Sequence, residues 1–529
     1  MADPRDPMRM LLAHARPAAD ARDLPALQHI LAGIAVDPLT KAQRLLEASY
    51  ALSSEGEYVS ARTAALLALA TGVRNTKVLP DMAARLRTFN EAGLLLELIK
   101  GAGPVDRLPI PVLLAFAAQL SYLNCQQEAL RMVDEARRAD PDYPPTLLAR
   151  GQILTYLGRL DEAAASIEAC ITRAPEIAQA HWFLAHVRKA SSEHNQVARL
   201  RRGLRRPALP PNERASLAFA LHKELDDLGD HDSAWQAVEV ACKAKRSTLK
   251  YTPSESRALV DALVHQPAAV PLAMADRPGR TPIFIVGMHR SGTTLLEQLL
   301  DASQDVAGIG ELYDFTSAMR HATDHHCRGV IDQAIVQRAS GVDLHAVGRT
   351  YLEGVEWRLG GAPFFTDKLP SNFLNVGFIC RALPHARILH MVRDPVETCF
   401  SNLREMFSDA NPYSYDQAEL ADYFIQYRRL MTHWHAAYPG RVLDVSYEAL
   451  TRDPEAVMRG VAGFCGIGFV EGMKDPRSSG RAVATASAVQ VREGVVRRAV
   501  PKWHPYAERL KPLASALRAG GVELPGYPP

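Results

Sequence analysis

The segment 282–300, PIFIVGMHRSGTTLLEQLL, constrains the fold of this chain more than any other. The apolar run 283–286 is typical of a buried strand, a glycine loop from Gly287 to Gly292 follows it, and the apolar period beginning at Thr293 predicts a helix. The first turn of such a helix has unpaired backbone N–H groups at the positive end of the helix dipole, so the segment predicts an anion-binding loop. The side chains that can add donors are those of Arg290, Ser291, Thr293 and Thr294.

The loop has the glycine spacing of a Walker A loop, G-x-x-x-x-G-K-[ST], but Thr293 stands where that motif has its Lys. Arg290 is the nearby cation. No apolar run ending in an Asp follows that would predict the magnesium ligand of a nucleotide hydrolase. A P-loop kinase or hydrolase is therefore the weaker interpretation, and the loop predicts a different phosphate-bearing donor.

The length of the chain predicts several domains, and its composition is ordinary. With 529 residues, and about 150 residues per domain, roughly two to four units are expected. A formal net charge of +2 gives no electrostatic sign of nucleic-acid binding. The seven cysteines form no C-x-x-C pair, so reduced and mostly buried thiols are predicted. Charges and prolines interrupt the N-terminal residues, and no run approaches the ~20 apolar residues of a membrane span, which predicts a cytoplasmic protein.

The first half is rich in Ala and Leu with helical periodicity, and segments 111–143 and 145–177 align at a period of 34. The matched pairs are Asn124 with Gly158, Glu128 with Glu162, Ala129 with Ala163, and Pro141 with Pro175. The pattern resembles a tetratricopeptide repeat (TPR), in which a small Ala lets two helices approach, Gly or Asn permits the turn, and Pro ends the second helix. A helical solenoid over 1–264 is predicted, with a plain helical bundle as the alternative. Further repeats are expected at 178–204 and 213–246, and weaker helix pairs at 43–76 and 77–108.

The second half has a different pattern. Residues 265–280, rich in Pro, Ala and Arg, predict a linker. After it, apolar β-runs alternate with helical stretches, which favours a parallel sheet covered by helices. The predicted fold is thus an all-α N-terminal domain followed by a P-loop-like α/β domain at 281–529. Its predicted strands are 282–286, 386–392 and 441–445.

The run MVRDPVETCFSN predicts a second anion site. Val392 ends a strand, Asp394 can cap the next helix, and Pro395 suits its first position. This places Arg393 at the carboxyl end of the strand and Ser401 in the second helical turn. A guanidinium fork with a hydroxyl is well suited to a dianion.

Six motifs in this half occur in the order and approximate spacing of a sulfotransferase domain. They are PIFIVGMHRSGTTLLEQLL, GIGELYDF, FTDKLPSNF, ILHMVRDPVETCFSN, VLDVSYEAL and TASAVQVR…VPKW. Residues from roughly 281 to 505 resemble tyrosylprotein sulfotransferases and bacterial TPR-sulfotransferases, and the helical repeats in front match the bacterial form. The resemblance implies 3′-phosphoadenosine 5′-phosphosulfate (PAPS) as the sulfuryl donor.

The resemblance also implies which residues grip that donor. It assigns the 3′-phosphate to Arg393 and Ser401, with a contact from Lys502, and a nucleotide contact to Tyr447. One residue departs from the family, because His289 stands where the family usually has Pro. His289 is predicted either to loosen the loop or to add one donor toward the anion. The residues assigned to the 5′-phosphosulfate are Arg290, Ser291, Gly292, Thr293 and Thr294.

The residues of the transfer step follow from the same resemblance. Glu311 matches the general base of the tyrosylprotein enzymes. A phenol with a pKa of about 10 is barely ionised at neutral pH, so a base within reach matters. Lys368 matches the lysine that neutralises the bridging oxygen and sulfuryl group in the transition state. Ser487 and Arg290 match further stabilisers of the transferring group.

The resemblance implies no metal, because Arg and Lys can neutralise a sulfuryl group, which carries less charge than a phosphoryl group. The segment HATDHHC is the one cluster that tests this, since His321 and His325 would share a helix face, with Cys327 adjacent. A polar helix end or loop is the favoured interpretation there. His385 and His390 have no such partners in the sequence and are predicted to be structural.

The acceptor is the least constrained part of the prediction. The resemblance and the peptide-sized groove that TPR helices can offer favour a tyrosine of a protein or peptide. A carbohydrate, a lipid or a small phenol is the alternative acceptor. The rival from another class is a TPR scaffold whose sulfotransferase half has lost catalysis. Neither nucleic acid nor a membrane span is expected, and a homodimer stays open.

Overall fold

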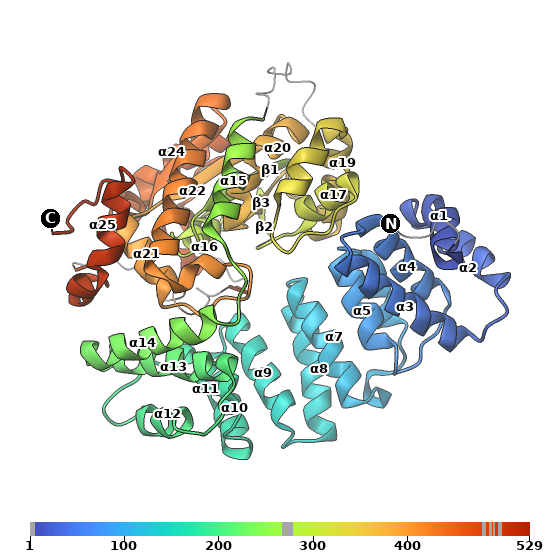
Figure 1. The fold of residues 1–529 in the computed structure, drawn as a ribbon, viewed down its shortest axis with the longest axis horizontal. Helices are drawn as coiled ribbons and strands as arrows, with labels where there is room; N and C mark the ends of the chain where they lie inside the picture. The colour runs from blue at the N-terminus through green and yellow to red at the C-terminus, as the bar shows by residue number, and fades with distance from the viewer. Residues whose placement is uncertain are drawn as a thin grey trace. The chain divides into compact units, whose positions relative to one another are not determined.

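The computed structural model describes residues 6–266, 279–478, 483–485, 489, 492, 494–495 and 500–528. The chain forms two compact units, each built from two segments (Figure 1). One comprises Met1–Pro141 and Tyr313–Arg358, and the other comprises Asp142–Leu312 and Leu359–Pro529. The predicted fold class, a helical N-terminal region followed by an α/β region with a parallel sheet, is confirmed. Most of the predicted linker lies outside the described residues.

The described residues of the first unit form helices joined by turns and loops, without a strand. Its helices are α1 (Pro7–Asp20), α2 (Leu24–Ala32), α3 (Pro38–Ser54), α4 (Tyr58–Ala70), α5 (Leu79–Thr88), α6 (Ala92–Lys100), α7 (Ile110–Tyr122), α8 (Gln126–Ala139), α17 (Asp314–Thr323), α18 (Gln333–Arg338) and α19 (Leu344–Val355). Hydrogen bonds from main-chain N–H groups join the two segments. The Val59 N–H donates to Asp324 Oδ1 at 2.8 Å, and the His326 N–H donates to the Gly56 carbonyl at 3.0 Å.

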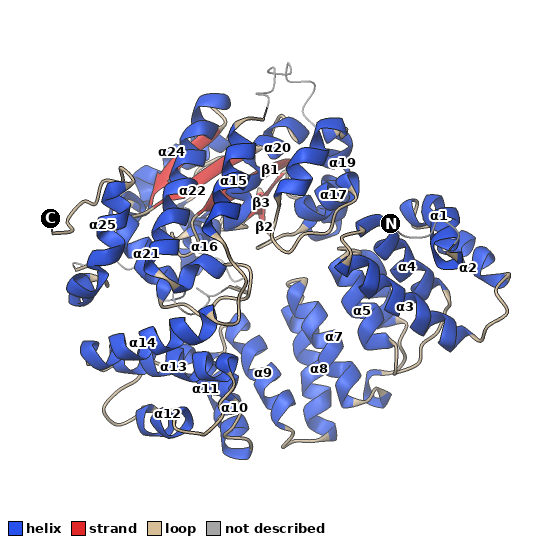
Figure 2. Ribbon diagram, viewed as in Figure 1, coloured by secondary structure: helices blue, strands red, loops and turns tan. Residues whose placement is uncertain are grey.

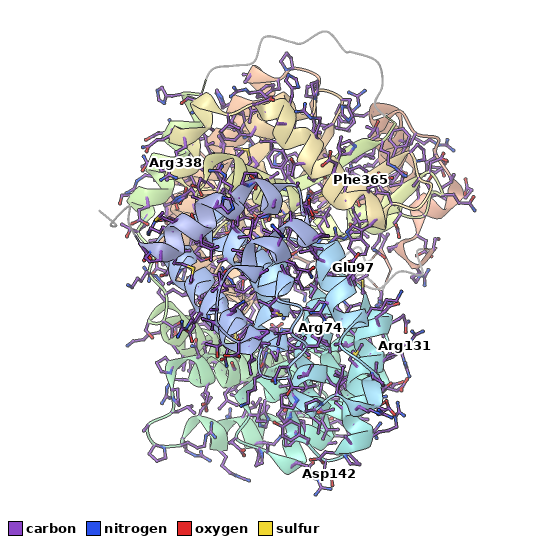
Figure 3. All side chains as sticks on the ribbon, turned by 90° about the vertical axis from the view of Figure 1, so that its right-hand side faces the viewer. Arg74, Glu97, Arg131, Asp142, Arg338 and Phe365 are labelled. Atoms are coloured by element: carbon purple, nitrogen blue, oxygen red, sulfur yellow. The ribbon has the colours of Figure 1, made fainter. Side chains whose placement is uncertain are left out.

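The HATDHHC segment lies at a helix end, as favoured from its sequence. Helix α17 ends at Thr323, so His321 lies in its last turn and His325 lies beyond it, and the two do not share a helix face. Arg338, labelled in Figure 3, donates to the carbonyls of Thr323 and Asp324. His325 Nε2 lies 2.7 Å from Asp332 Oδ2 instead of facing His321.

The second unit contains further helix pairs and the whole sheet. Its helices are α9 (Pro144–Leu157), α10 (Leu160–Arg173), α11 (Ala178–Val187), α12 (Val197–Leu204), α13 (Pro211–Asp227), α14 (His231–Arg246), α15 (Pro253–Val264), α16 (Thr293–Leu300), α20 (Val376–Ala382), α21 (Pro395–Leu403), α22 (Gln417–Ala437), α23 (Tyr447–Arg452), α24 (Pro454–Cys465) and α25 (Lys511–Ala519). Among the described residues, no helix has both the length and the apolar character that a membrane crossing requires.

The turns inside successive helix pairs repeat at the interval found in the sequence. Gly56, Asn90, Asn124 and Gly158 all have a positive φ, and each follows the previous one by 34 residues. Gly reaches this left-handed region without strain and Asn at small cost, which explains the match of Asn124 with Gly158. The register therefore extends to the pairs α3–α4 and α5–α6, whose sequence signatures were weaker.

The sheet has five parallel strands in the order β2-β3-β1-β4-β5 (Figure 2). They are β1 (Thr281–Gly287), β2 (Val306–Gly308), β3 (Phe364–Asp367), β4 (Arg387–Val392) and β5 (Val442–Ser446). Three of them were predicted, while β2 and β3 were missed. Side chains alternate between two buried faces, so Ile283 and Ile285 pack with helices α16 and α24, whereas Phe284, also fully buried, points to the opposite face.

Ion pairs tie the last repeat helices to the α/β part of the same unit. Arg246 of α14 makes two bonds of 2.8 Å with Glu419 of α22. Asp226 of α13 accepts from Arg404, the residue that follows α21, at 3.2 Å and from the Tyr506 hydroxyl at 2.6 Å. Helix α21, which carries Ser401, is thus held from the repeat side.

Candidate active site

The carboxyl ends of all five strands carry predicted site residues. Because the strands are parallel, these ends meet at one edge of the sheet, where ligands of open α/β folds bind. Arg290 follows β1, Glu311 follows β2, Lys368 follows β3, Arg393 follows β4 and Tyr447 follows β5. Because β1 is the central strand, the glycine loop that follows it lies between the ends of β2 and β3 on one side and those of β4 and β5 on the other.

The glycine loop is shaped for a ligand. Arg290 (φ 66°) and Gly292 (φ 108°) have left-handed backbones, a conformation that arranges neighbouring N–H groups into an anion-binding concavity. Helix α16 begins directly after Gly292, which has no side chain to cap it. A Cβ on Gly292 would lie 2.4 Å from the Tyr447 ring, so only glycine fits. The hydroxyl of Ser291 is buried and finds no hydrogen-bond partner among the described residues.

The side chain of Arg290 lies beneath this loop. It is 7% exposed, and its Nε lies 3.4 Å from the Ser401 hydroxyl. Its Nη1 lies 3.8 Å from Glu405 Oε2. Burial lowers the pKa of Arg290 from its ordinary value, and Glu405 opposes this. The predicted 5′- and 3′-phosphate residues are therefore in contact.

Arg393 joins the second anion motif to the first. Its Nη1 donates to the Arg290 carbonyl at 2.9 Å, and its Nη2 donates to Glu397 at 3.0 Å. The guanidinium lies 4.4 Å from the centre of the Tyr447 ring. The predicted helix start is confirmed, because α21 begins at Pro395 and Asp394 accepts from the N–H of Glu397, the third residue of the helix, at 2.7 Å.

Glu397 extends this network toward the C-terminal motif. Its second oxygen accepts from the Trp503 N–H at 3.4 Å, and Trp503 follows Lys502 directly. A cavity of about 1110 Å³ borders Arg393 and Tyr447 and is also lined by Arg428 and Arg452. There is therefore room for a ligand beside the second anion motif.

Glu311 and Lys368 form an ion pair at the other end of this edge. Lys368 Nζ lies 2.6 Å from Glu311 Oε1; the Lys368 side chain is fully buried, while that of Glu311 is 36% exposed. The Lys368 N–H also donates to the Gly310 carbonyl at 3.0 Å. A buried ammonium beside a half-exposed carboxylate provides one cation for developing negative charge and one base that an acceptor can reach.

The C-terminal motif is described only in part. Ser487 lies outside the described residues, as do Arg497 and Arg498. Thr485 Oγ1 lies 3.4 Å from Thr294 Oγ1. The motif therefore reaches the first turn of α16, directly after the glycine loop, at Thr485.

Sequence reasoning missed the acidic side chains of the site. Glu297, Glu397 and Glu405 are all less than 10% exposed, and they contact residues of the two anion motifs or chain neighbours of the Glu311–Lys368 pair. One signal in the sequence could have revealed Glu297. It lies within the leucine period LLEQLL, where a charged residue occupies a position that faces the core.

His289, the departure from the family pattern, has defined contacts. Its Nδ1 lies 3.3 Å from the Tyr413 hydroxyl, its carbonyl accepts from Asn402 at 2.7 Å, and its ring meets Phe407 edge to face. Burial, reinforced by the positive charges of Lys368 and Arg290, lowers the pKa of His289 to about 4. The imidazole is therefore neutral at physiological pH.

This low pKa predicts a loss of stability in acid. Between pH 6.5 and 4 the unfolded chain binds a proton at His289 that the folded protein does not, so stability falls as the pH falls through this window. We expect His289→Asn to reduce the difference in unfolding free energy between pH 7 and pH 5 by about 1–2 kcal/mol. Denaturant unfolding at both pH values measures it, with the exposed His194→Asn as control. An unchanged difference contradicts the buried neutral state.

His390 has partners that its sequence context did not reveal. Its Nδ1 lies 2.7 Å from Asp444 Oδ1, which also lies 2.7 Å from His435 Nε2, and its Nε2 contacts the Tyr427 hydroxyl. In the described part of the chain these two histidines and Asp444 are the group of three whose ligand atoms could hold a metal ion. Both bonds to Asp444 are of ordinary hydrogen-bond length.

Comparison with known proteins agrees with this geometry. Residues 282–471 match the model of a sulfotransferase family. An uncharacterized protein of Aquifex aeolicus (strain VF5) is 30% identical over 409 residues, which cover 75% of this chain and 53% of that protein. Protein-tyrosine sulfotransferase 2 of Gallus gallus is 26% identical over 212 residues, which cover 35% of this chain and 51% of that protein. The chain thus spans about half the length of these relatives.

Among solved structures, the sulfotransferase domain of the Synechococcus PCC 7002 olefin synthase aligns with 17% identity and a TM-score of 0.29, over 48% of this chain and 99% of that chain. The family match covers β1 to β5 and therefore the strand ends that carry the loop, the ion pair and Arg393. Residues 282–471 form a sulfotransferase-family domain.

Proposed function

We propose that this protein transfers a sulfuryl group from PAPS to the hydroxyl of an acceptor, and that the acceptor is a tyrosine of a protein or peptide. The observation that carries the proposal is the Glu311–Lys368 pair, at 2.6 Å, on the sheet edge that also bears the glycine loop. A base, a buried cation and an anion loop are the parts that sulfuryl transfer needs.

Each residue has a distinct task in this proposal. Glu311 accepts the proton of the acceptor hydroxyl as the new O–S bond forms. Lys368 offsets the negative charge that grows on the leaving phosphate oxygen as the old S–O bond breaks. Arg290 and the first-turn N–H groups of α16 hold the phosphosulfate end, and Arg393 with Ser401 holds the 3′-phosphate. Bound PAPS supplies the sulfuryl group and leaves as adenosine 3′,5′-bisphosphate.

The residues present fit such a donor. The buried Ser291 hydroxyl, which has no hydrogen-bond partner among the described residues, lies within the loop, and Gly292 lets the Tyr447 ring pack directly against the loop backbone. Arg290, Arg393 and Lys368 are basic and less than one-fifth exposed along the same edge. Each of these cations already pairs with one carboxylate, of Glu405, Glu397 and Glu311 in turn, and the phosphates of the donor would add further charge-assisted hydrogen bonds.

Tyrosine as the acceptor rests on distant relatives. The protein from Gallus gallus carries that activity in its name, and it aligns with about one-third of this chain. A phenol is barely ionised at neutral pH, so a tyrosine acceptor gives the base Glu311 a purpose. The helix pairs stay the predicted place for the acceptor peptide.

A labelling experiment tests the proposal. The full chain is incubated with PAPS carrying radiolabelled sulfate and with a cell lysate, and tandem mass spectrometry locates the labelled residue. We expect label on tyrosine, and we expect adenosine 3′,5′-bisphosphate to inhibit labelling and to bind in calorimetry.

Two other outcomes contradict parts of the proposal. Label on a carbohydrate or a lipid retains the enzyme but overturns the tyrosine acceptor. Absence of both labelling and bisphosphate binding overturns the donor as well. Bisphosphate binding without any labelling would instead favour the scaffold alternative.

A further inference from the structure

We propose that Glu297 is a positioning residue that fixes the base Glu311 and the cation Lys368 relative to the glycine loop; the inference rests on the proposed function. Glu297 lies in α16, the helix that begins at the end of the loop, and is 1% exposed. Its Oε1 accepts from the Gly310 N–H at 2.8 Å and from the Thr366 hydroxyl at 3.0 Å. One carboxylate oxygen thus links the loop helix to the ends of two strands.

Both partners of Glu297 lie next to a proposed catalytic residue. Gly310 directly precedes Glu311, and Thr366 lies two residues before Lys368. The Gly310 peptide is held on both sides, because its N–H donates to Glu297 and its carbonyl accepts from the Lys368 N–H at 3.0 Å. The Lys368–Glu311 ion pair closes a ring of contacts that starts at Glu297, passes through Gly310 to the ion pair, and returns through Thr366 to Glu297.

Gly310 needs this support. Its φ of 81° lies in the left-handed region, and a glycine there has more conformational freedom than any other residue. Without bonds on both sides, the Glu311 backbone could move relative to Lys368. A displacement of about 1 Å at a reacting group can cost about 10²-fold in rate, so the bonds from Glu297 matter for transfer.

A buried carboxylate is also a costly way to make a merely structural link. Burial of a charge is unfavourable unless hydrogen bonds compensate for it. Bonds to an ionised acceptor are shorter and stronger than neutral ones, which suits a contact whose task is precision. A Gln of the same shape keeps an oxygen that can accept both bonds but makes them weaker, so it should keep the fold and loosen the placement.

The test compares Glu297→Gln with a matched control on the full chain. Glu224 of α13 is also a buried carboxylate, 3% exposed, and accepts from the Gln196 N–H at 2.8 Å and from its side chain at 3.1 Å, away from the proposed site. Glu224→Gln should cost comparable stability and leave kcat within about two-fold of wild type. Thr366→Val, which removes one bond to Glu297, is a second and milder variant.

We expect Glu297→Gln to lower kcat for transfer from PAPS by about 10- to 100-fold, with the affinity for adenosine 3′,5′-bisphosphate changed by less than about three-fold. We expect Thr366→Val to lower kcat by a smaller factor. Hydrogen exchange gives a readout that does not depend on activity. The Gly310 and Lys368 amides, both bonded in wild type, should exchange about ten-fold faster in Glu297→Gln and at the wild-type rate in Glu224→Gln.

Unchanged amide exchange and a kcat within two-fold of wild type in Glu297→Gln would overturn the inference. An equal loss of bisphosphate affinity would also overturn it, because it would assign Glu297 to the donor site as a whole. If Glu297→Gln does not fold, Thr366→Val decides by the same criteria. If wild type binds the bisphosphate but transfers nothing, the proposed function fails, and amide exchange still decides whether Glu297 holds Gly310.

Discussion

Replacing Glu311 by Gln is expected to lower the rate of sulfuryl transfer by about 10²- to 10⁴-fold, the usual contribution of a general base. The amide keeps the length of the side chain and an oxygen that can accept from Lys368, but it cannot take the proton of the acceptor. Donor binding should persist, because the anion loop and Arg393 have no direct bond to Glu311 among those described. Single-turnover transfer of radiolabelled sulfate and calorimetry with adenosine 3′,5′-bisphosphate measure the two effects separately.

The matched control is Glu419→Gln. Glu419 is also paired with a cation, Arg246, at 2.8 Å, but it lies on α22 in the contact with the repeat helices. Its replacement should leave the transfer rate near that of wild type. If Glu311→Gln keeps more than about a tenth of the wild-type rate, another group is the base and the ion pair with Lys368 has a different purpose.

The sequence predicted those parts of the site that depend on local chain geometry. The strand, loop and helix around Gly292, and the strand end and cap around Arg393, are each continuous segments of at most 20 residues, so period and capping rules define them. β2 and β3 were missed because they have three and four residues, too few to show a period. Glu311 and Lys368 follow these two strands, so their placement depended on the resemblance to a family.

The remaining contacts could not be predicted because they join distant segments with no local signature. The bond from Val59 to Asp324 joins the two segments of the first unit across 265 residues of sequence, and the shared acceptor Glu297 joins Gly310 to Thr366. Glu297 looks like one polar residue in a leucine period until its partners are known. Buried charges of this kind depend on tertiary contacts, which period and propensity do not encode.

His289 shows how a departure from a family pattern can be compatible with the same fold. A Pro at this position would lack the N–H and fix φ, whereas His289 is held by three neighbours, Asn402, Tyr413 and Phe407. The sequence predicted that His289 would loosen the loop or add a donor, and the structure adds a third alternative. The contacts of the neutral His289 ring hold the loop in place, whereas a Pro would do so by restricting φ.

Gly292→Ala is expected to lower the affinity for adenosine 3′,5′-bisphosphate by about 10²-fold or more. The added Cβ would lie 2.4 Å from Cδ2 of Tyr447, and the φ of 108° is strained for any residue with a side chain. The ring must move, and Arg393, which lies 4.4 Å from its centre, loses its support. The first-turn N–H groups of α16 are displaced at the same time, so both proposed phosphate contacts suffer. Calorimetry with the bisphosphate measures the loss.

A control variant and a double-mutant cycle separate the clash with Tyr447 from a general loss of stability. Gly460, inside α24, has no neighbour within 4 Å of an added Cβ, so Gly460→Ala should raise stability by about 0.5–1 kcal/mol and leave affinity unchanged. If the clash with Tyr447 is the main cost, Gly292→Ala should destabilise a Tyr447→Ala protein less than wild type, and the two changes should couple in the unfolding free energy. Additive effects would assign the cost to backbone strain alone. Wild-type affinity in Gly292→Ala would mean that the glycine loop does not hold the nucleotide, because the loop cannot keep its shape with that Cβ in place.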